Sequence, residues 1–407
     1  MAKRIILIAV MTALVTMFGC ASGTEPEETK IVAPGGDETE TTVDETAADT
    51  TDAPDTSDET ETTAAEEKTP ERLAAEKIMS EMTIDEKIGQ LFFSRIPTDY
   101  DTAISDMEKY QPGGYVFFAS EFENRTPETM KTYTDALKGA AKIVPLLAVD
   151  EEGGTVTRIS RFKQYRAEKF LSPRELMACG TELVASDTRE KCSLISSLGL
   201  NLNLAPVADI STDPNDFIYY RSAGDLVAAT DYVTAFVTES VKAGVGSALK
   251  HFPGYGNNAD THTGIAVDKR SAETFRASDF LPFKAGIDAG CGIVMVSHNI
   301  VECFDKDYPA SLSAEVHCVL REELGFDGVI TTDDLAMQAI TDSYGSGEAA
   351  VLAIEAGNDL ICCSDLPVKY EAVKSAYESG RISLSRIEES VLRILEYKVT
   401  MGLLSSD

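Results

Sequence analysis

Short apolar runs alternate with longer amphipathic segments along most of the chain after about residue 69. Continuous apolar runs separated by helices are typical of parallel strands covered on both faces. The segments between them include the predicted helices 127–142, 225–244 and 313–325, the last ending at Gly325 as its C-cap. The eight predicted strands are QLFFS (90–94), GGYVFF (113–118), VPLLAVD (144–150), LNLNLAPVAD (200–209), GSALKHF (246–252), GIVMVSHN (292–299), GVITTDD (328–334) and NDLICCS (358–364).

This alternation of strands and helices predicts an α/β fold, a single TIM-type (β/α)8 barrel over residues 71–407. Roughly 340 residues is large for one domain, but α/β barrels commonly reach this size. An open, doubly wound sheet is the structural alternative, because it shows the same alternation.

The beginning of the chain follows a different pattern. Lys3 and Arg4 precede an apolar run at 5–18 that is short for a membrane span, so residues 1–19 read as a signal peptide. Cys20 follows, which resembles the lipobox of bacterial lipoproteins, although Met17 stands where Leu is usual. We therefore expect lipidation at Cys20 and an exported protein anchored to a bacterial cell membrane and facing outward. The alternative is an ordinary signal peptide and a secreted protein.

Residues 20–70 predict a disordered, acidic linker. Of the formal net charge of −32, about half lies between residues 21 and 67, which contain 16 Asp or Glu and one Lys. Such a segment has too few apolar side chains to offset its ordering entropy, and like charges keep it extended, as suits a tether. The acidic balance also argues against nucleic acid as a partner.

Polar side chains end six of the predicted strands. In a barrel, the carboxyl ends of all strands meet at one mouth, where active sites are built, so we expect a shared functional site there. These strand-end residues are Asp150, Asp209, Lys250, His251, His298, Asp333, Asp334 and Ser364.

Several kinds of chemistry find little support. His251 and His262 are eleven residues apart and no HExxH occurs, so a metal-dependent hydrolase is a weak alternative. There is no GxSxG, and no GxGxxG follows the first predicted strand. We therefore predict neither a metal nor a cofactor.

The cysteines are scattered along the chain. A Cys179–Cys192 disulfide is possible, but the sequence does not support it.

Glycoside hydrolysis fits the polar residues better. It usually needs two groups beside one bond, a proton donor and a nucleophile or base. Asp333 and Asp334 are neighbours on a predicted strand and should point to opposite faces, so only one can reach the mouth and the other should be structural. His262 is the candidate partner, since histidine can give and take a proton near neutral pH. Asp260 could orient its ring and favour its protonated form.

Several motifs together resemble family 3 glycoside hydrolases of the β-N-acetylhexosaminidase type. The likeness covers about residues 71–404, and the most specific part is KHFPGYG with DTH, at 250–262. The other motifs are MTIDEKIGQLF (82–92), PGGYVFF (112–118), VDEEGGTVTR (149–158), NLNLAPVAD (201–209), RSAGD (221–225), VMVSHNI (294–300), YPASLS (308–313) and FDGVITTDDLAM (326–337).

The resemblance implies a role for each matching residue. Asp333 matches the nucleophile, His262 the acid/base and Asp260 its partner. The residues that match the groups holding the acetamido sugar are Asp150, Arg158, Arg221, Lys250 and His251. Three features depart from the family pattern: Tyr255 stands where His is frequent, the loop from His251 to His262 is one residue shorter, and RSAGD lacks an aromatic residue after RS.

The resemblance thus implies a monomeric, exo-acting, retaining β-N-acetylglucosaminidase. Its substrate would be a glycan with terminal N-acetylglucosamine, such as a peptidoglycan fragment or a chitin-type oligosaccharide. A β-glucosidase or β-xylosidase on the same barrel, a phosphorolytic enzyme and a tethered, inactive sugar-binding lipoprotein are the alternatives.

Overall fold

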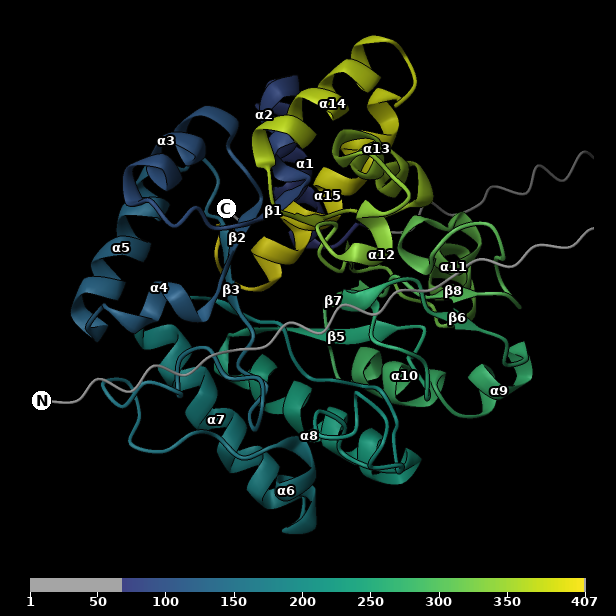
Figure 1. Ribbon diagram of the computed structural model, residues 1–407. Helices are drawn as coiled ribbons and strands as arrows, with labels where there is room; N and C mark the ends of the chain where they lie inside the picture. The colour runs from purple at the N-terminus through teal and green to yellow at the C-terminus, as the bar shows by residue number, and fades with distance from the viewer. Residues whose placement is uncertain (1–67, 406–407) are drawn as a thin grey trace, which may run out of the picture. The chain divides into compact units, whose positions relative to one another are not determined.

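Eight parallel strands form a barrel in the computed structural model, which describes residues 68–405 of the 407. The strand order is β10-β1-β2-β3-β4-β5-β7-β9, and a parallel bridge between Thr331 and Leu360 joins the last strand to the first. Helices surround the strands (Figure 1). The barrel strands are β1 (Phe92–Arg95), β2 (Gly114–Phe117), β3 (Leu146–Val149), β4 (Leu202–Asn203), β5 (Gly246–Phe252), β7 (Ile293–Val296), β9 (Val329–Thr332) and β10 (Ile361–Cys363).

The predicted TIM-type barrel is confirmed, because each of the eight apolar runs coincides with one strand of the barrel, although β1 extends one residue beyond its run. The helices are α1 (Pro70–Ser80), α2 (Ile84–Gln90), α3 (Tyr100–Tyr110), α4 (Ala119–Glu123), α5 (Pro127–Ala140), α6 (Pro173–Ala178), α7 (Thr181–Ser197), α8 (Leu226–Ala243), α9 (Ala272–Ala277), α10 (Phe280–Asp288), α11 (Ala314–Cys318), α12 (Gln338–Thr341), α13 (Ser346–Ala356), α14 (Leu366–Glu378) and α15 (Leu384–Thr400). Short 3₁₀ turns form η1 (Thr261–Thr263) and η2 (Ala310–Leu312), and a π-helical turn forms η3 (Val319–Glu323).

Local sequence signals set the ends of the helix that leads into β5. Asp225 caps the first turn of α8, since its carboxylate accepts a hydrogen bond from the amide of Ala228 at 3.0 Å. The helix ends at Gly244, whose φ of 66° lies in the left-handed region that glycine adopts readily. Two residues later β5 begins, so the chain turns back and runs toward the mouth where Lys250 and His251 lie.

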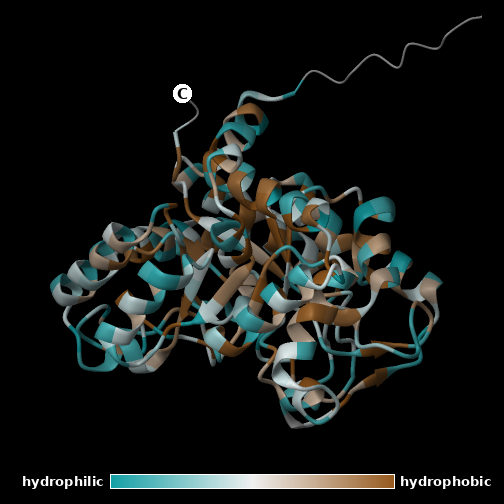
Figure 2. Cartoon of the chain, turned by 90° about the horizontal axis from the view of Figure 1, so that it is seen from above, coloured by the Kyte–Doolittle hydropathy of each residue, from teal (hydrophilic) through white to brown (hydrophobic). Residues whose placement is uncertain are grey.

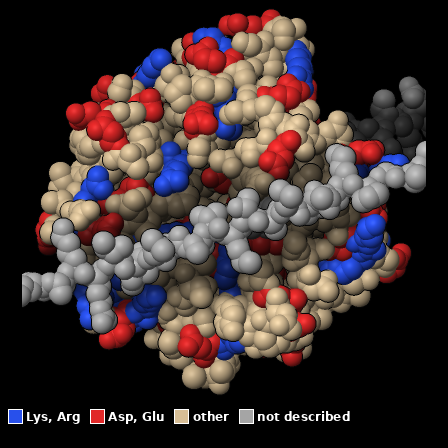
Figure 3. Space-filling model, in the orientation of Figure 1, with Lys and Arg blue, Asp and Glu red and all other residues tan. Residues whose placement is uncertain are grey.

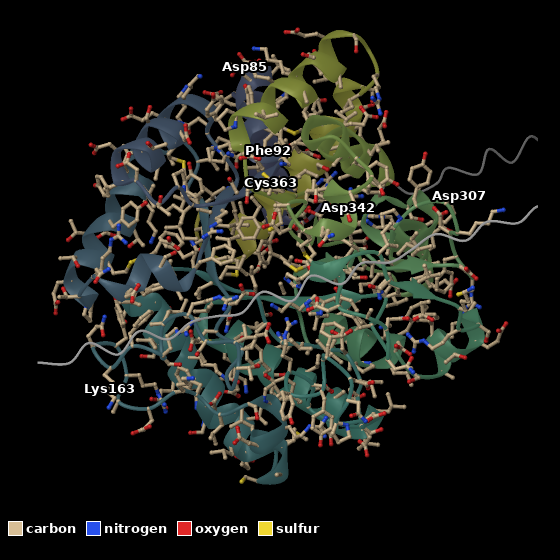
Figure 4. All side chains as sticks on the ribbon, in the orientation of Figure 1. Asp85, Phe92, Lys163, Asp307, Asp342 and Cys363 are labelled. Atoms are coloured by element: carbon tan, nitrogen blue, oxygen red, sulfur yellow. The ribbon has the colours of Figure 1, made fainter. Side chains whose placement is uncertain are left out.

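Hydrophobic side chains fill the barrel and the space between strands and helices. In Figure 2, apolar residues concentrate on the central strands while polar residues dominate the outer surfaces of the helices. Phe92 on β1 and Cys363 on β10, two adjacent parallel strands, are both fully buried and lie near one another in the interior (Figure 4). Burial of both strand faces explains why these strands read as continuous apolar runs.

Three local features differ from the expectations. Two strands of two residues each, β6 (Val267–Asp268) and β8 (Ile300–Val301), pair outside the barrel. The helix expected at 313–325 is α11 followed by the π-helical η3, and Gly325 follows with φ of 66°. The Cys179–Cys192 disulfide, which was only a possibility, does not form: both are free thiols, and Cys192 is buried facing Ser240 whereas Cys179 is exposed.

The surface in Figure 3 carries acidic and basic side chains interspersed, without a large patch of one sign on that face. Within residues 68–405, no helix has both the length and the apolar character needed to cross a membrane. The signal peptide at 1–19, the lipidation site Cys20 and nearly all of the linker lie outside the described residues, so they stay predictions.

Candidate active site

A cavity of about 580 Å³ opens at the carboxyl ends of the barrel strands. This volume lies within the usual range for small-molecule sites, about 300–1,000 Å³. Seven residues predicted from sequence line it: Asp150, Arg158, Arg221, Lys250, His251, His262 and Asp333. The eighth, Asp260, contacts His262. Strand ends from separate parts of the chain therefore converge, as the barrel prediction requires.

One wall is a charge cluster made of Asp150, Glu152, Arg221 and Lys250. Lys250 Nζ lies 2.7 Å from Asp150 Oδ1 and 2.7 Å from Glu152 Oε1. Arg221 binds the same Glu152 in a bidentate arrangement, with Nε and Nη2 lying 3.0 and 2.8 Å from its two carboxylate oxygens. Removing one member of a buried ion pair typically costs about 3–5 kcal/mol, so these side chains hold one another in fixed positions.

Burial and charge act in opposite directions on this cluster. Burial disfavours the ionised form of Glu152, yet Arg221 and Lys250 together hold its pKa well below the usual range. Burial likewise opposes the charge of Lys250, but Asp150 and Glu152 raise its pKa above the ordinary value. Glu152 and Lys250 are thus charged at neutral pH, and the cluster presents fixed donors and acceptors, which suits the hydroxyl groups of a sugar.

A second buried network orients His251. Its Nδ1 lies 2.7 Å from Asp209 Oδ2 and its Nε2 lies 3.2 Å from Arg221 Nη2. Because a guanidinium only donates, Nε2 accepts this hydrogen bond and Nδ1 carries the proton donated to Asp209. Asp209 is nearly inaccessible to solvent and does not line the cavity, so it acts on the site through His251.

Asp333 lies just beyond β9, partly exposed to the cavity. Burial alone would favour its neutral form, but His251 and His298, with the Asp334 amide and Lys250, lower the pKa of its carboxyl below the ordinary value. An ionised carboxylate in a partly enclosed cavity is what a glycosidase nucleophile requires.

His298 is held behind this carboxylate. Its Nδ1 lies 2.7 Å from Ser311 Oγ and its Nε2 lies 3.0 Å from the carbonyl oxygen of Asp334. The side chain is fully buried, and burial lowers the pKa of its ring. His298 thus stands near the mouth, as expected, and supports the chain around Asp333 without lining the cavity.

The expectation that only one of Asp333 and Asp334 reaches the mouth is wrong, since both line the cavity. The reason is that β9 ends at Thr332, so both residues belong to the loop after the strand and escape its alternation. Asp334 differs in its environment: burial raises the pKa of its carboxyl, and its Oδ1 accepts the amide of Ala336 at 2.9 Å. Another strand-end residue, Ser364, lines a neighbouring surface pocket instead.

His262 is brought to the cavity by the 253–264 loop despite its shortness. Its side chain is 63% exposed, and Nδ1 lies 2.7 Å from Asp260 Oδ1. The same carboxylate oxygen accepts the amide of His262 at 3.0 Å, which fixes the direction of the ring. A carboxylate only accepts, so Nδ1 carries the proton of this hydrogen bond, which Nε2 does not join.

The glycines of this loop suggest a packed turn at its start. A Cβ at Gly254 would come within 2.5 Å of Asp279 Oδ1, and one at Gly256 within 2.7 Å of Arg270 Cζ. Both have positive φ, of 118° and 54°. At these two positions glycine is needed for close packing and for left-handed backbone.

The sequence interpretation assigned no role to several residues that shape the site. Asp209 was expected at the mouth only as a strand-end residue, and Glu152, two residues after the end of the predicted strand 144–150, was not singled out; only the structure reveals their partners. Arg95 and Phe118 also line the cavity, and the Arg95 guanidinium stacks 4.4 Å from the centre of the Phe118 ring. Within the described residues, no cluster of side chains has the composition of a metal site.

Comparison with known families accounts for this arrangement. The model of the glycosyl hydrolase family 3 N-terminal domain matches residues 83–397, which include every site residue named above. The chain belongs to glycosyl hydrolase family 3. Its family 3 relatives include a β-hexosaminidase of Xanthomonas campestris, 32% identical over 265 residues, which are 62% of this chain and 78% of the relative. A β-hexosaminidase, LpqI, of Mycobacterium tuberculosis is 31% identical over 277 residues, 65% of this chain and 70% of the relative.

Solved structures of family 3 proteins share the barrel. A β-N-acetylglucosaminidase from Paenibacillus superposes with a TM-score of 0.75 at 31% identity, covering 79% of this chain and 63% of that one. M. tuberculosis LpqI superposes with a TM-score of 0.72 at 27% identity, covering 79% of this chain and 95% of that one. The chain thus spans less than two thirds of the Paenibacillus protein, and 56% of the β-hexosaminidase A of Pseudoalteromonas piscicida.

Proposed function

We propose that this family 3 protein is an exo-acting, retaining β-N-acetylglucosaminidase. The observation that carries the proposal is one cavity with two groups in its wall: Asp333, whose pKa is lowered, and His262 paired with Asp260. Together they supply the nucleophile and the proton donor that cleavage of a glycosidic bond needs. The β-hexosaminidase names of the relatives support an N-acetylhexosamine as the sugar.

The reaction runs in two displacements. The Asp333 carboxylate attacks the anomeric carbon while His262 gives its proton to the departing glycosidic oxygen, which leaves as an alcohol. A water molecule then enters, gives a proton to His262, and attacks the same carbon to release Asp333. Each displacement inverts the anomeric centre, so the product keeps the β configuration. Neither step needs a cofactor.

The charge cluster and His251 hold the sugar in this scheme. Lys250, Arg221 and Arg158 donate to hydroxyl or acetamido oxygens, while Asp150 accepts from hydroxyl groups. His251 is fixed by Asp209 and so adds a side chain of defined direction. Because these groups are already ordered by one another, binding costs little further side-chain entropy.

The substrate class can be tested with a panel of nitrophenyl glycosides. We expect kcat/KM for the β-N-acetylglucosaminide to exceed that for the β-glucoside and the β-xyloside by about 10²-fold or more, since charged groups matched to an acetamido sugar are left unpaired by other sugars. Assays with and without inorganic phosphate, with analysis for a sugar phosphate, separate hydrolysis from phosphorolysis. Preference for glucose or xylose, or sugar binding without any turnover, would contradict the proposal.

We also propose that the protein is exported and held at the outer face of a membrane through a lipid on Cys20, with the acidic linker as the tether. The sequence of residues 1–20 supports this, and the natural glycan would then be extracytoplasmic. The Cys20→Ala variant should lose incorporation of a labelled fatty acid and pass from the membrane to the soluble fraction. Equal labelling of both proteins would contradict the anchor.

A further inference from the structure

The side chain of Tyr255 links the buried start of the 253–264 loop to the segment that carries the exposed His262. Tyr255 is 1% exposed, and its hydroxyl lies 2.6 Å from Oγ1 of Thr261, which is itself fully buried. Thr261 stands between Asp260 and His262 in the chain, within the short η1 turn. The hydrogen bond therefore attaches the segment that carries the acid/base pair to the buried base of the 253–264 loop.

The other side of Tyr255 contacts the sugar-binding network. Its amide donates to Asp209 Oδ1 at 2.8 Å, while Asp209 Oδ2 accepts from His251. The Tyr255 ring packs edge to face against the rings of His251 and Phe217, with centroids 5.0 and 4.8 Å away. A ring held on two sides has little rotamer freedom, so its hydroxyl is presented to Thr261 in a defined place.

The base of the loop is fixed independently of this hydrogen bond. Arg270 forms ion pairs with Asp279 at 2.9 Å and with Asp268 at 2.8 Å, and its NH2 donates to the carbonyl of Gly254. Asn258 donates to Asp268 at 2.7 Å. Loss of the Tyr255 hydroxyl would leave these contacts in place, so its effect should fall on the segment around Thr261.

We propose that Tyr255 is a positioning residue, which through Thr261 holds His262 over the cavity at a fixed place relative to the sugar bound by His251. This proposal rests on the proposed function. Burial raises the pKa of the Tyr255 hydroxyl, so it stays protonated and able to bond with Thr261 over the working pH range. A displacement of about 1 Å in an acid/base group can lower a rate by about 10²-fold, so one buried hydrogen bond can matter for proton transfer.

The test uses Tyr255→Phe, with Tyr232→Phe as matched control. Tyr232 is also fully buried, and its hydroxyl has no hydrogen-bond partner among the described residues. Each purified protein is assayed on a β-N-acetylglucosaminide with a poor alcohol leaving group and on the nitrophenyl glycoside, which needs little proton donation. For Tyr255→Phe we expect kcat/KM to fall about 10- to 100-fold on the first and no more than about threefold on the second. The inhibition constant of N-acetylglucosamine should stay unchanged.

A double-mutant cycle with Thr261→Val tests whether Tyr255 acts on His262 through Thr261. If both hydroxyls act through the hydrogen bond between them, kcat/KM of the double variant should be no lower than that of the more impaired single variant. Three results would overturn the proposal: additive losses, an equal loss on both substrates, or a Tyr255→Phe protein that behaves like the Tyr232→Phe control. Absence of turnover in the wild-type protein would instead refute the proposed function, so the two failures are distinguishable.

Discussion

The Asp333→Asn protein should lose about 10⁴- to 10⁶-fold in kcat on nitrophenyl β-N-acetylglucosaminide, because it lacks the carboxylate that forms the glycosyl-enzyme. The amide has nearly the same shape, so sugar binding and folding should persist. Steady-state kinetics measures the loss, and circular dichroism with thermal unfolding confirms that the variant folds. The size of this effect follows from the chemistry, since no other step of the proposed reaction can proceed without the nucleophile.

Asp327→Asn is the matched control for this change. Asp327 is exposed two residues before β9, at the end of the strand opposite Asp333, so the same substitution is made beside the same strand but away from the mouth. It should keep kcat within about twofold of wild type, as exposed substitutions away from a site usually do little. An Asp333→Asn protein with near wild-type turnover would exclude this residue as the nucleophile.

His262→Ala should impair catalysis in a way that depends on the leaving group. We expect kcat/KM to fall about 10²- to 10⁴-fold for a substrate with a poor alcohol leaving group, which needs a proton as it departs. The nitrophenyl glycoside should lose much less in kcat/KM, because nitrophenolate departs without protonation. Its kcat should nevertheless fall, since water now attacks the glycosyl-enzyme without a base.

Adding azide to the His262→Ala variant tests whether His262 acts as the base that deprotonates water. It is a nucleophile that needs no deprotonation, so it should raise kcat of His262→Ala on the nitrophenyl substrate and yield the β-glycosyl azide. Wild type should respond little. Asp260→Ala should show the same pattern with smaller changes, because Asp260 acts only by orienting the His262 ring through its hydrogen bond to Nδ1. Losses independent of the leaving group, without any response to azide, would contradict the role of His262.

Hydrophobic pattern predicted the barrel well for a physical reason. Its strands are buried on both faces, so their sequences stand out as continuous apolar runs between helices. The paired β6 and β8 have two residues each, too few to show any period. The π-helical turn η3 likewise lies within a run that reads as ordinary helix, because a change of hydrogen-bond register leaves no mark on hydrophobic spacing.

The sequence predicted contacts between site residues that are close in the chain, but it missed those between distant segments. His262 and Asp260 are two residues apart, so the sequence alone is enough to predict their pairing. Glu152 is held by Arg221 and Lys250 from two distant segments, and such long-range partners cannot be identified from one sequence. Asp334 was misjudged because the end of β9 could not be placed to the residue, and a difference of one position decides which side chains follow strand alternation.

Packing contacts hold the 253–264 loop, which joins the sugar-binding residues to the acid/base pair. In the structure, Gly254 and Gly256 fit against Asp279 and Arg270, while Tyr255 bonds to Thr261 next to His262. The departure of Tyr255 from the family pattern thus coincides with the contact that ties the two parts together.

The covalent glycosyl-enzyme on Asp333 can be tested most directly by trapping it. A 5-fluoro-N-acetylglucosaminyl fluoride should react with the protein faster than the resulting adduct hydrolyses, because the ring fluorine slows both steps while the fluoride leaving group speeds the first. Mass spectrometry of the intact protein should then show the gain of one fluorinated sugar, and peptide fragmentation should place it on Asp333. An adduct on another residue, or turnover without any adduct, as expected if the acetamido oxygen of the sugar acts as nucleophile, would contradict this mechanism.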